Sequence, residues 1–232
     1  DRGLEWMVTV LFSGALDNHG RWPEGWVMHQ EHHHCSHGRL FPAEAAARLD
    51  EPTRKSRQPP ETLIGLLDLF SGAKVLDFGA GTGFFAVPIA QHLRKLGANG
   101  KVWAVDSQPA MFDHLRAKLA GLDLAPIETL VGSTDELLQM EAGNIDRVLL
   151  ANVLHEVPDR PKLYAALAHI LAPQGLVLIV DWHPEGSTDH GPPKEHRLDP
   201  KSVGESLSQS GFNRIEISPC FSDHYSVRAI RS

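Results

Sequence analysis

Cysteine is scarce in this sequence of 232 residues, which contains only Cys35 and Cys220. Two cysteines cannot build a disulfide framework, so we expect a reducing, cytoplasmic setting. The sequence also lacks any apolar run close to the ~18 residues that span a membrane. Basic residues are outnumbered, with 22 Lys and Arg against 29 Asp and Glu, for a net charge of −7 at pH 7. Because nucleic-acid binders usually present a basic face, we expect neither a membrane nor a nucleic acid as partner.

The chain divides into two regions of different composition. Hydrophobic residues make up 42% and charged residues 22%, which is ordinary for a globular protein, and the length suits one α/β domain. Residues 1–49 show no sustained period and are rich in histidine, so we predict a partly flexible, His-rich N-terminal extension. Within it, residues 43–49 favour a short helix. Residues 50–60 are charged and marked by prolines, which predicts an extended connection at the start of a domain over residues 50–232.

Beyond residue 60, helical and strand-like segments alternate. Short apolar runs predict strands at 74–78, 101–106, 127–132, 146–154 and 176–182, with a closing strand pair at 212–220 and 225–231. Helical patterns and caps predict helices at 61–70, 84–97, 109–122, 134–140, 158–171 and 199–211. The inner strands are continuous apolar runs, which is typical of a parallel sheet covered on both faces. The predicted fold is therefore α/β: a doubly wound, mostly parallel, seven-stranded Rossmann-like sheet with a terminal antiparallel strand pair.

A glycine-rich turn, VLDFGAGTGFF at 75–85, joins the first strand to the next helix. Ligands of doubly wound sheets bind at the carboxyl ends of the strands, and glycines there let the backbone approach a ligand closely. The dinucleotide fingerprint G-x-G-x-x-G would need a glycine at position 84, where the sequence has Phe84. Asp77, two residues before the first glycine, would also repel a pyrophosphate. An acid at this position suits a ligand that carries positive charge and hydroxyl groups.

The stretch DFGAGTG (77–83) resembles the first motif of class I S-adenosylmethionine-dependent methyltransferases. Asp106, at the end of the second strand, resembles the acid that takes the ribose hydroxyls of that cofactor. Ser133 and Thr134 follow the third strand, where the family approaches the adenine, although helix capping explains them equally well. The cofactor-binding residues that the resemblance implies are Asp77, Gly79, Ala80, Gly81, Gly83, Asp106, Ser107, Ser133, Thr134 and Asn152.

This resemblance covers about residues 50–232 and implies the methyltransferase version of the predicted sheet. It is closest to bacterial small-molecule methyltransferases of the ubiquinone/menaquinone-biosynthesis type. Some of these carry stretches similar to LDEPTR (49–54), to NVLHEV (152–157), and to the DW and GPP segments between Asp181 and Pro193. The implied cofactor is S-adenosyl-L-methionine, and the implied partner is a small-molecule methyl acceptor.

Methyl transfer from a sulfonium is an in-line displacement, so the protein mainly holds donor and acceptor close together. A base is needed only where the acceptor must lose a proton. Polar groups follow the fourth and fifth strands, and of these we predict His155 and Asp181 as candidate catalytic residues. The alternatives are that His155 packs against a neighbouring loop and that Asp181 caps a turn or pairs with Arg197. Arg54 could fold over the ligand or lie exposed on the surface.

Two further polar segments have open interpretations. The Pro- and Gly-rich stretch 183–197 could be a binding loop or a solvated connector. In the N-terminal cluster, His29, His33 and His37 would share one face of a helix, and Cys35 lies between them. Their spacing matches no structural zinc pattern. We therefore predict a tail that binds metal weakly at most, with a specific metal site or a role in substrate gating as the alternatives.

The sequence as a whole predicts an S-adenosylmethionine-dependent methyltransferase that acts on a small molecule. One alternative is a dinucleotide-dependent oxidoreductase, which Phe84 and Asp77 oppose. Another is a non-catalytic cofactor-binding or metal-binding protein on the same fold. An arsenite methyltransferase is a further possibility, but that family is associated with several working cysteines. The sequence does not identify the methyl acceptor or the oligomeric state.

Deletion of residues 1–37 tests the predicted division of the chain. We expect the shortened protein to keep its fold and its cofactor binding, because the α/β pattern is complete without this segment. Thermal melting and S-adenosylmethionine binding measure both properties, and metal content before and after the deletion tests the histidine cluster. Loss of soluble protein would mean instead that residues 1–37 pack as part of the domain.

Overall fold

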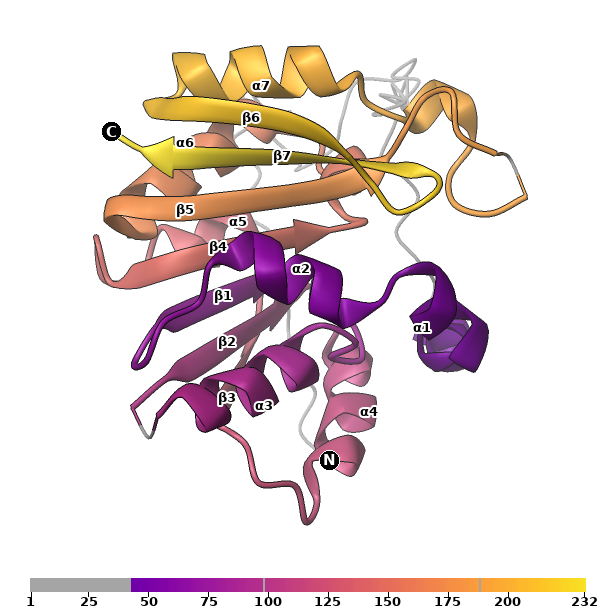
Figure 1. The fold of residues 1–232 in the computed structure, drawn as a ribbon, viewed down its shortest axis with the longest axis vertical. Helices are drawn as coiled ribbons and strands as arrows, with labels where there is room; N and C mark the ends of the chain where they lie inside the picture. The colour runs from indigo at the N-terminus through magenta and orange to yellow at the C-terminus, as the bar shows by residue number, and fades with distance from the viewer. Residues whose placement is uncertain (1–42, 98, 188) are drawn as a thin grey trace, which may run out of the picture. The chain divides into compact units, whose positions relative to one another are not determined.

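The computed structural model describes residues 43–97, 99–187 and 189–232. They form one seven-stranded sheet with the strand order β3-β2-β1-β4-β5-β7-β6 (Figure 1). The strands are β1 (Lys74–Phe78), β2 (Lys101–Asp106), β3 (Ile127–Val131), β4 (Ile145–Ala151), β5 (Leu171–Trp182), β6 (Phe212–Cys220) and β7 (His224–Arg231).

The strand directions confirm the predicted fold class. Strands β3, β2, β1, β4 and β5 pair in parallel, and β7 lies antiparallel between β5 and β6. The chain order reverses between β1 and β4, which are direct neighbours, with Val75 opposite Arg147. Such a reversal opens a crevice at the carboxyl ends of the strands, where doubly wound sheets bind their ligands.

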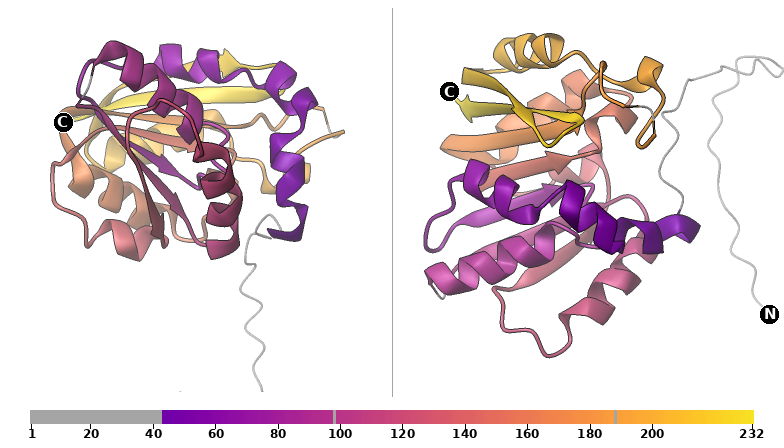
Figure 2. Two further views of the ribbon diagram at one scale, coloured as in Figure 1. Left: turned by 90° about the horizontal axis from the view of Figure 1, so that it is seen from below. Right: turned by 45° about the vertical axis from the view of Figure 1, so that its right-hand side comes forward.

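Helices cover both faces of the sheet (Figures 1 and 2). One layer contains α2 (Pro60–Leu67), α3 (Ala86–Leu96) and α4 (Pro109–Leu119), and the other contains α5 (Thr134–Leu137), α6 (Arg160–Ile170) and α7 (Pro200–Gln209). The remaining helices are α1 (Pro52–Arg57) and the short 3₁₀ helices η1 (Ala43–Asp50), η2 (Leu154–Glu156) and η3 (Lys194–His196).

The two apolar layers explain the continuous apolar runs of the strands. Successive strand residues point to opposite faces. Leu76 and Val148 belong to the core under α5, α6 and α7, whereas Val75 and Leu149 belong to the core under α2, α3 and α4. All four side chains are fully buried. Because both faces are covered, neither set of alternate residues can be polar.

Three local predictions were wrong, and the first is the start of β5, which lies at Leu171 and not at residue 176. Residues 50–60 are not an extended connection, because α1 occupies most of this segment and α2 begins at Pro60. Prolines stand in the first turns of both helices, where their fixed φ is compatible with the helix and the missing N–H is not needed. The fourth strand ends at Ala151 rather than at residue 154, since Asn152 has a φ of 61° and η2 follows.

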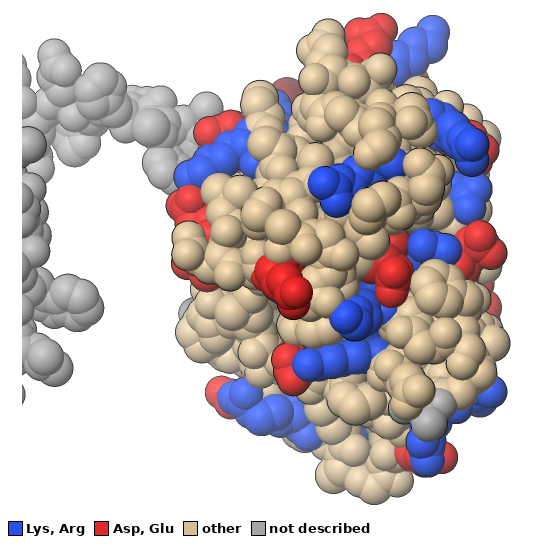
Figure 3. Space-filling model, turned by 90° about the vertical axis from the view of Figure 1, so that its left-hand side faces the viewer, with Lys and Arg blue, Asp and Glu red and all other residues tan. Residues whose placement is uncertain are grey.

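The amino ends of the parallel strands face away from the crevice and carry charges of both signs (Figure 3). A hollow of about 270 Å³ at this end includes Asp68, Glu216 and Arg228 in its wall. Arg228 lies 3.3 Å from Glu216 and 3.9 Å from Asp68. Across the described ranges, no helix is both long and apolar enough to cross a bilayer.

Candidate functional site

The glycine-rich loop between β1 and α3 adopts a conformation that requires its glycines. Gly79, Gly81 and Gly83 have φ angles of 72°, 54° and 80°, in the region that side chains with a Cβ disfavour. A Cβ on Gly79 would lie 2.5 Å from a methyl carbon of Val153, and a Cβ on Gly83 would lie 2.4 Å from one of Leu115. Both the backbone conformation and the lack of space therefore demand glycine.

The loop is fastened to the end of β2. Its first two amides donate hydrogen bonds to the carbonyl oxygen of Val105, at 2.8 and 2.9 Å. The carboxylate of Asp106 accepts the amide of Gly81 at 2.8 Å and that of Gln108 at 2.9 Å. Burial raises the pKa of Asp106, and these two backbone hydrogen bonds partly offset the effect. Asp106 thus lies beside the loop, where the resemblance places the ribose-binding acid.

Asp77 is a buried carboxylate on β1, immediately before the loop. Only 2% of the residue is exposed, and its Oδ2 atom has no hydrogen-bond partner among the described residues. Burial raises the pKa of Asp77 to about 7, with a further contribution from the negative charge of Asp106 and an opposing one from Arg54. An unpartnered buried acceptor is costly, so Asp77 is suited to receive a cationic or hydrogen-bond-donating group of a ligand.

Arg54 of α1 folds over the loop instead of lying exposed on the surface. Its guanidinium lies 4.1 Å from the ring centroid of Phe84. It also donates hydrogen bonds to the carbonyl oxygen of Leu49 at 2.9 Å and to Oε1 of Gln58 at 3.3 Å. Burial lowers the pKa of Arg54 to about 10, which leaves it charged near neutral pH. The structure therefore favours the first of the two alternatives for this residue.

A second contact ties the same N-terminal segment to the loop. The hydroxyl of the buried Thr82 donates to Asp50 at 3.0 Å, and Nζ of Lys118 donates to the Thr82 carbonyl oxygen at 2.8 Å. Lys118 also forms an ion pair with Asp50. We call residues 43–58 the strap, because η1, α1 and Gln58 together lie across the glycine loop. Figure 2 shows η1 and α1 beyond the edge where the parallel strands end.

The two candidate catalytic residues are direct partners. His155 lies in η2, and its backbone amide and Nδ1 lie 3.0 and 2.8 Å from the two carboxylate oxygens of Asp181. Burial lowers the pKa of His155, but the hydrogen bond and negative charge of Asp181 outweigh it, so the pKa is raised overall. Nε2 of His155 lies 3.8 Å from the carboxylate of Glu156. Asp181 therefore fixes the imidazole orientation and leaves Nε2 on the opposite side of the ring.

Arg197 does not pair with Asp181 as the alternative interpretation supposed. Its guanidinium is buried and donates to five backbone carbonyl oxygens, those of His183, Gly186, Ser187, His190 and Pro192. These bonds hold residues 183–187 and 190–192 around the guanidinium of Arg197. Most described residues between 184 and 196 are exposed, so a binding loop and a solvated connector both stay predictions for this stretch.

Two polar residues at the site were missed by the sequence interpretation. Gln58 is 5% exposed, and its Oε1 accepts a hydrogen bond from Nδ2 of Asn152 at 3.0 Å. Its Nε2 lies 3.0 Å from Nε2 of His224, which is also 5% exposed. Gln58 stands in a charged, proline-marked stretch and His224 at the start of the last strand. Neither position carries a sequence signal, since only the fold brings them together.

The other predicted residues occupy less distinctive surroundings. Ser133 caps α5 in a reciprocal box with Glu136, so the capping interpretation is confirmed, while an adenine contact stays a prediction. Ser107 is exposed beside Asp106. Cys220 is a buried thiol whose pKa burial raises to about 11. The histidine cluster and Cys35 lie outside the described residues, and within those residues no group of three or more potential ligands could hold a metal ion.

The donor and acceptor groups fit the cofactor that the sequence implied. S-adenosylmethionine carries a sulfonium, an ammonium, a carboxylate and ribose hydroxyls. Asp77 and Asp106 supply acceptors for its cationic and hydroxyl groups, and Arg54 supplies a cation for its carboxylate. These groups all lie at the carboxyl ends of β1 and β2 or on the strap above them.

Comparison with known proteins points to one family. Residues 75–175 match the methyltransferase domain family. A solved SAM-dependent methyltransferase from Aquifex aeolicus is similar, with a TM-score of 0.73 and 28% identity over 83% of this chain and 100% of that one.

Curated relatives agree over shorter segments. The ubiquinone/menaquinone biosynthesis C-methyltransferase of Idiomarina loihiensis is 32% identical over 111 residues, which are 48% of this chain and 43% of the relative. The arsenite methyltransferase of Halobacterium salinarum is 28% identical over 162 residues, which are 64% of this chain and 39% of the relative. The matched region is thus less than half the length of these relatives.

Asp181→Asn tests the charge coupling to His155. We expect the pKa of His155 to fall, because the burial that disfavours the imidazolium would no longer be offset. NMR titration of the imidazole measures this, with Asp113→Asn, an exposed carboxylate on α4, as the matched control.

The same substitution has a predicted effect on stability. A histidine with a raised folded-state pKa stabilises the fold below its unfolded pKa of about 6.5, and loses that contribution as the pH rises through the folded value. The stability deficit of Asp181→Asn should therefore be largest on the acid side of that window. An unchanged His155 titration would contradict the coupling.

Proposed function

We propose that this chain, as a member of the class I S-adenosylmethionine-dependent methyltransferases, transfers a methyl group from S-adenosylmethionine to a small-molecule acceptor. The family match over residues 75–175 and the similarity to the Aquifex aeolicus enzyme support the membership. The observation that carries the proposal is the pairing of the glycine loop with Asp77. A buried carboxylate with an unpartnered oxygen directly before such a loop suits a cationic ligand and opposes a pyrophosphate.

The cofactor would be held by the groups around the loop. Asp77 and Oδ1 of Asn152, both unpartnered acceptors, suit the ammonium group, and Asp106 suits the ribose hydroxyls. Arg54 suits the carboxylate. Backbone and side chains of Gly79, Ala80, Gly81, Gly83, Ser107, Ser133 and Thr134 would surround the remainder. When bound, S-adenosylmethionine supplies a methyl group already activated on a positively charged sulfur.

On the acceptor side, His155 is the proposed base. Its Nδ1 is held by Asp181, so Nε2 is the atom that orients an acceptor hydroxyl and takes its proton. The raised pKa makes His155 a stronger base than a free imidazole. Asp181 stabilises the imidazolium that results, and acts as the positioning residue of the pair. The strap covers the glycine loop through the hydrogen bond of Thr82 to Asp50 and the contact of Arg54 with Phe84.

A dyad of this kind favours acceptors that must lose a proton, such as phenols, quinols and acidic carbon centres. The C-methyltransferase similarity supports that class. The similarity to the arsenite methyltransferase gives less support for an arsenite acceptor. The thiol of Cys220 is buried and its pKa is raised, which makes it a poor nucleophile or metalloid ligand. A small-molecule acceptor, in a cytoplasmic protein without a nucleic-acid or membrane partner, completes the proposal.

Cofactor binding provides the first test. S-adenosylmethionine should raise the melting temperature, because a ligand that binds only the folded state stabilises it by mass action. Asp106→Ala should weaken this binding by roughly 1–3 kcal/mol through the loss of hydrogen bonds to a charged acceptor. Asp113→Ala, the exposed carboxylate on α4, should leave binding unchanged. Stabilisation by NADH and not by S-adenosylmethionine would refute the proposed function.

Turnover tests the role of the dyad. His155→Ala should lower kcat by about 10²-fold or more, the usual scale for a lost acid–base group. The affinity for S-adenosylhomocysteine should change little, since His155 is assigned to the acceptor side. Asp181→Asn should show the same separation more weakly. Equal losses of turnover and cofactor affinity would instead assign His155 to the cofactor pocket or to the structural core.

A further inference from the structure

Three arginine side chains, those of Arg147, Arg214 and Arg228, line the hollow at the amino ends of the parallel strands. The carboxylates of Asp68 and Glu216 lie in the same wall, so the charged side chains carry an excess of one positive charge. Figure 3 shows this end of the molecule, which lies opposite the glycine loop at the carboxyl ends of the strands. The hollow is therefore a place, separate from the candidate site, where an anion would be attracted.

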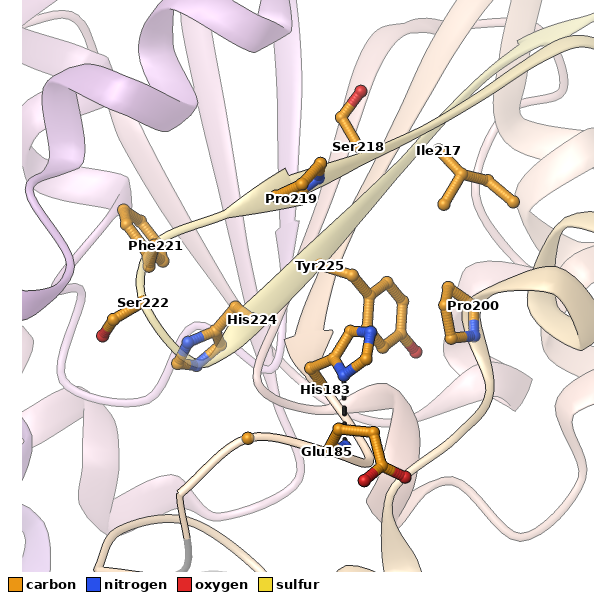
Figure 4. Close-up of a pocket in the computed structure, with 11 residues that line it drawn as sticks. His183, Glu185, Pro200, Ile217, Ser218, Pro219, Phe221, Ser222, His224 and Tyr225 are labelled. Atoms are coloured by element: carbon orange, nitrogen blue, oxygen red, sulfur yellow. Dashed lines mark hydrogen bonds between the residues drawn. The ribbon is translucent and has the colours of Figure 1, made fainter.

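A larger pocket of about 340 Å³ differs from this hollow in its lining (Figure 4). It lies beside the turn between β6 and β7, and Pro219, Phe221 and Tyr225 give it a mainly apolar and aromatic wall. Glu185 contributes a carboxylate, and none of its described lining residues is a lysine or an arginine. Of these two cavities, the hollow with the arginines is thus the one that suits an anion.

Two irregularities of the sheet shape the hollow. Residues 172–175 of β5 stand opposite residue 146 of β4, and residues 214 and 215 of β6 stand opposite residue 229 of β7. Gln174 lies in the first irregularity and Arg214 in the second, and both belong to the wall of the hollow. Bulges bend a strand and re-aim its side chains, and they are common beside functional sites.

The backbone of the wall is strained at three residues that are not glycine. Asp68, Gln174 and Arg214 have φ angles of 50°, 63° and 49°, in the left-handed region that side chains with a Cβ disfavour. The other described non-glycine residues with positive φ are Asn152, at the candidate site, and Phe221. Strain of this kind persists where the surrounding structure imposes it, and it concentrates at ligand sites. Three strained residues around one hollow therefore point to a ligand at this end of the sheet.

Two of the three arginines have no carboxylate partner. Arg228 forms ion pairs with Glu216 at 3.3 Å and with Asp68 at 3.9 Å. The hydrogen bonds of Arg147, by contrast, go only to backbone carbonyl oxygens, over distances of 2.8 to 3.2 Å. Arg214 forms no hydrogen bond or ion pair with any described residue. The charges of Arg147 and Arg214 are therefore available to a bound anion.

The polar groups of the hollow indicate the kind of anion that fits. A guanidinium recognises phosphate through parallel N–H donors, and phosphate has enough oxygens for two such groups. A carboxylate can be satisfied by one. Asp68 and Glu216 supply acceptors that suit hydroxyl groups, and Leu176 and Ile230 supply an apolar part of the wall. The volume of about 270 Å³ limits the ligand to a small molecule.

We propose that this hollow binds a small phosphate monoester, with its phosphate on Arg147 and Arg214 and its hydroxyl groups on Asp68 and Glu216. Arg228 holds both carboxylates in the wall through its ion pairs. The site faces away from the cofactor and the methyl acceptor, so it does not rest on the proposed methyl transfer. It gives the protein a second ligand at the opposite edge of the same sheet.

Ribose 5-phosphate is the probe for the full chain, and isothermal titration calorimetry at constant ionic strength is the measurement. We expect it to bind more tightly than inorganic phosphate, because only the ester has hydroxyl groups for the two carboxylates. Ribose, which lacks the phosphate, should not bind detectably. No binding of ribose 5-phosphate, equal binding of ribose, or an equal affinity for inorganic phosphate would overturn the proposal.

Arg214→Asn removes one of the two guanidinium groups and suits the backbone, since asparagine tolerates the left-handed conformation better than most side chains. We expect ribose 5-phosphate to bind at least tenfold more weakly, the scale of one lost hydrogen bond to a charged group, while Tm stays equal or rises. Arg116→Gln, which removes an exposed charge on α4, should leave the binding unchanged. Unchanged binding by Arg214→Asn, or an equal loss in Arg116→Gln, would contradict the assignment.

Competition with S-adenosylhomocysteine locates the bound phosphate. We expect both ligands to bind the chain at the same time, because the hollow and the glycine loop lie at opposite edges of the sheet. Displacement of one ligand by the other would assign ribose 5-phosphate to the glycine loop and overturn the proposal. Failure of S-adenosylhomocysteine to bind at all would refute the proposed methyltransferase function, while the comparison of Arg214→Asn with the wild type would still decide the phosphate site.

Discussion

The conformation of the loop after β1 is the constraint on which the rest of the site depends. Three glycines with positive φ turn the chain sharply from the strand into α3, and side chains of Val153 and Leu115 fill the space where Cβ atoms would be. The loop is not self-supporting. The end of β2 fixes it from one side through Val105 and Asp106, and the strap fixes it from the other. Each of these supports comes from a different part of the chain, so the loop exists only in the assembled sheet.

Acidic and basic side chains lie on opposite sides of this loop. Asp77 and Asp106 make the floor acidic, and the cations Arg54 and Lys118 lie on the strap side. Burial acts against the charge of both Asp77 and Arg54, raising the first pKa and lowering the second. A bound ligand with a positive charge and a carboxylate would complement both Asp77 and Arg54. The charges around the loop therefore favour a ligand that carries both a positive charge and a carboxylate.

Around the ends of β4 and β5, hydrogen bonds orient the histidine side chains. Asp181 orients His155, and Gln58 orients His224, so each imidazole has one nitrogen engaged by the protein. The two differ in their electrostatic surroundings. A carboxylate raises the pKa of His155, whereas burial without a direct anionic partner lowers that of His224 to about 4. The imidazole of His155 is therefore the stronger base of the two, and that of His224 stays neutral near pH 7.

Much of this was readable in the sequence. The parallel sheet followed from continuous apolar strands, because strands covered on both faces cannot alternate with polar residues. The glycine turn, Asp106, and the pair His155 and Asp181 were identified because they stand directly after strands, and parallel strands bring such positions to one edge. Of the strap, the sequence predicted the short helix over 43–49 and offered Arg54 as a residue that folds over the ligand, but it did not predict α1. The prolines of this segment favoured an extended connection, although a proline in the first turn also starts a helix.

The order of the strands along the chain, the covered sheet and the ligand edge follow from the sequence, since these depend on local pattern and chain connectivity. The partners of the polar groups do not follow from it, because they are set by how the elements pack. Gln58 meets Asn152 and His224 across 94 and 166 residues, and His155 meets Asp181 across 26. Such pairings depend on burial and on distances of about 3 Å, which appear only when separate elements pack. No local pattern records them, so the partners of His155 and of Gln58 became visible only in the folded protein.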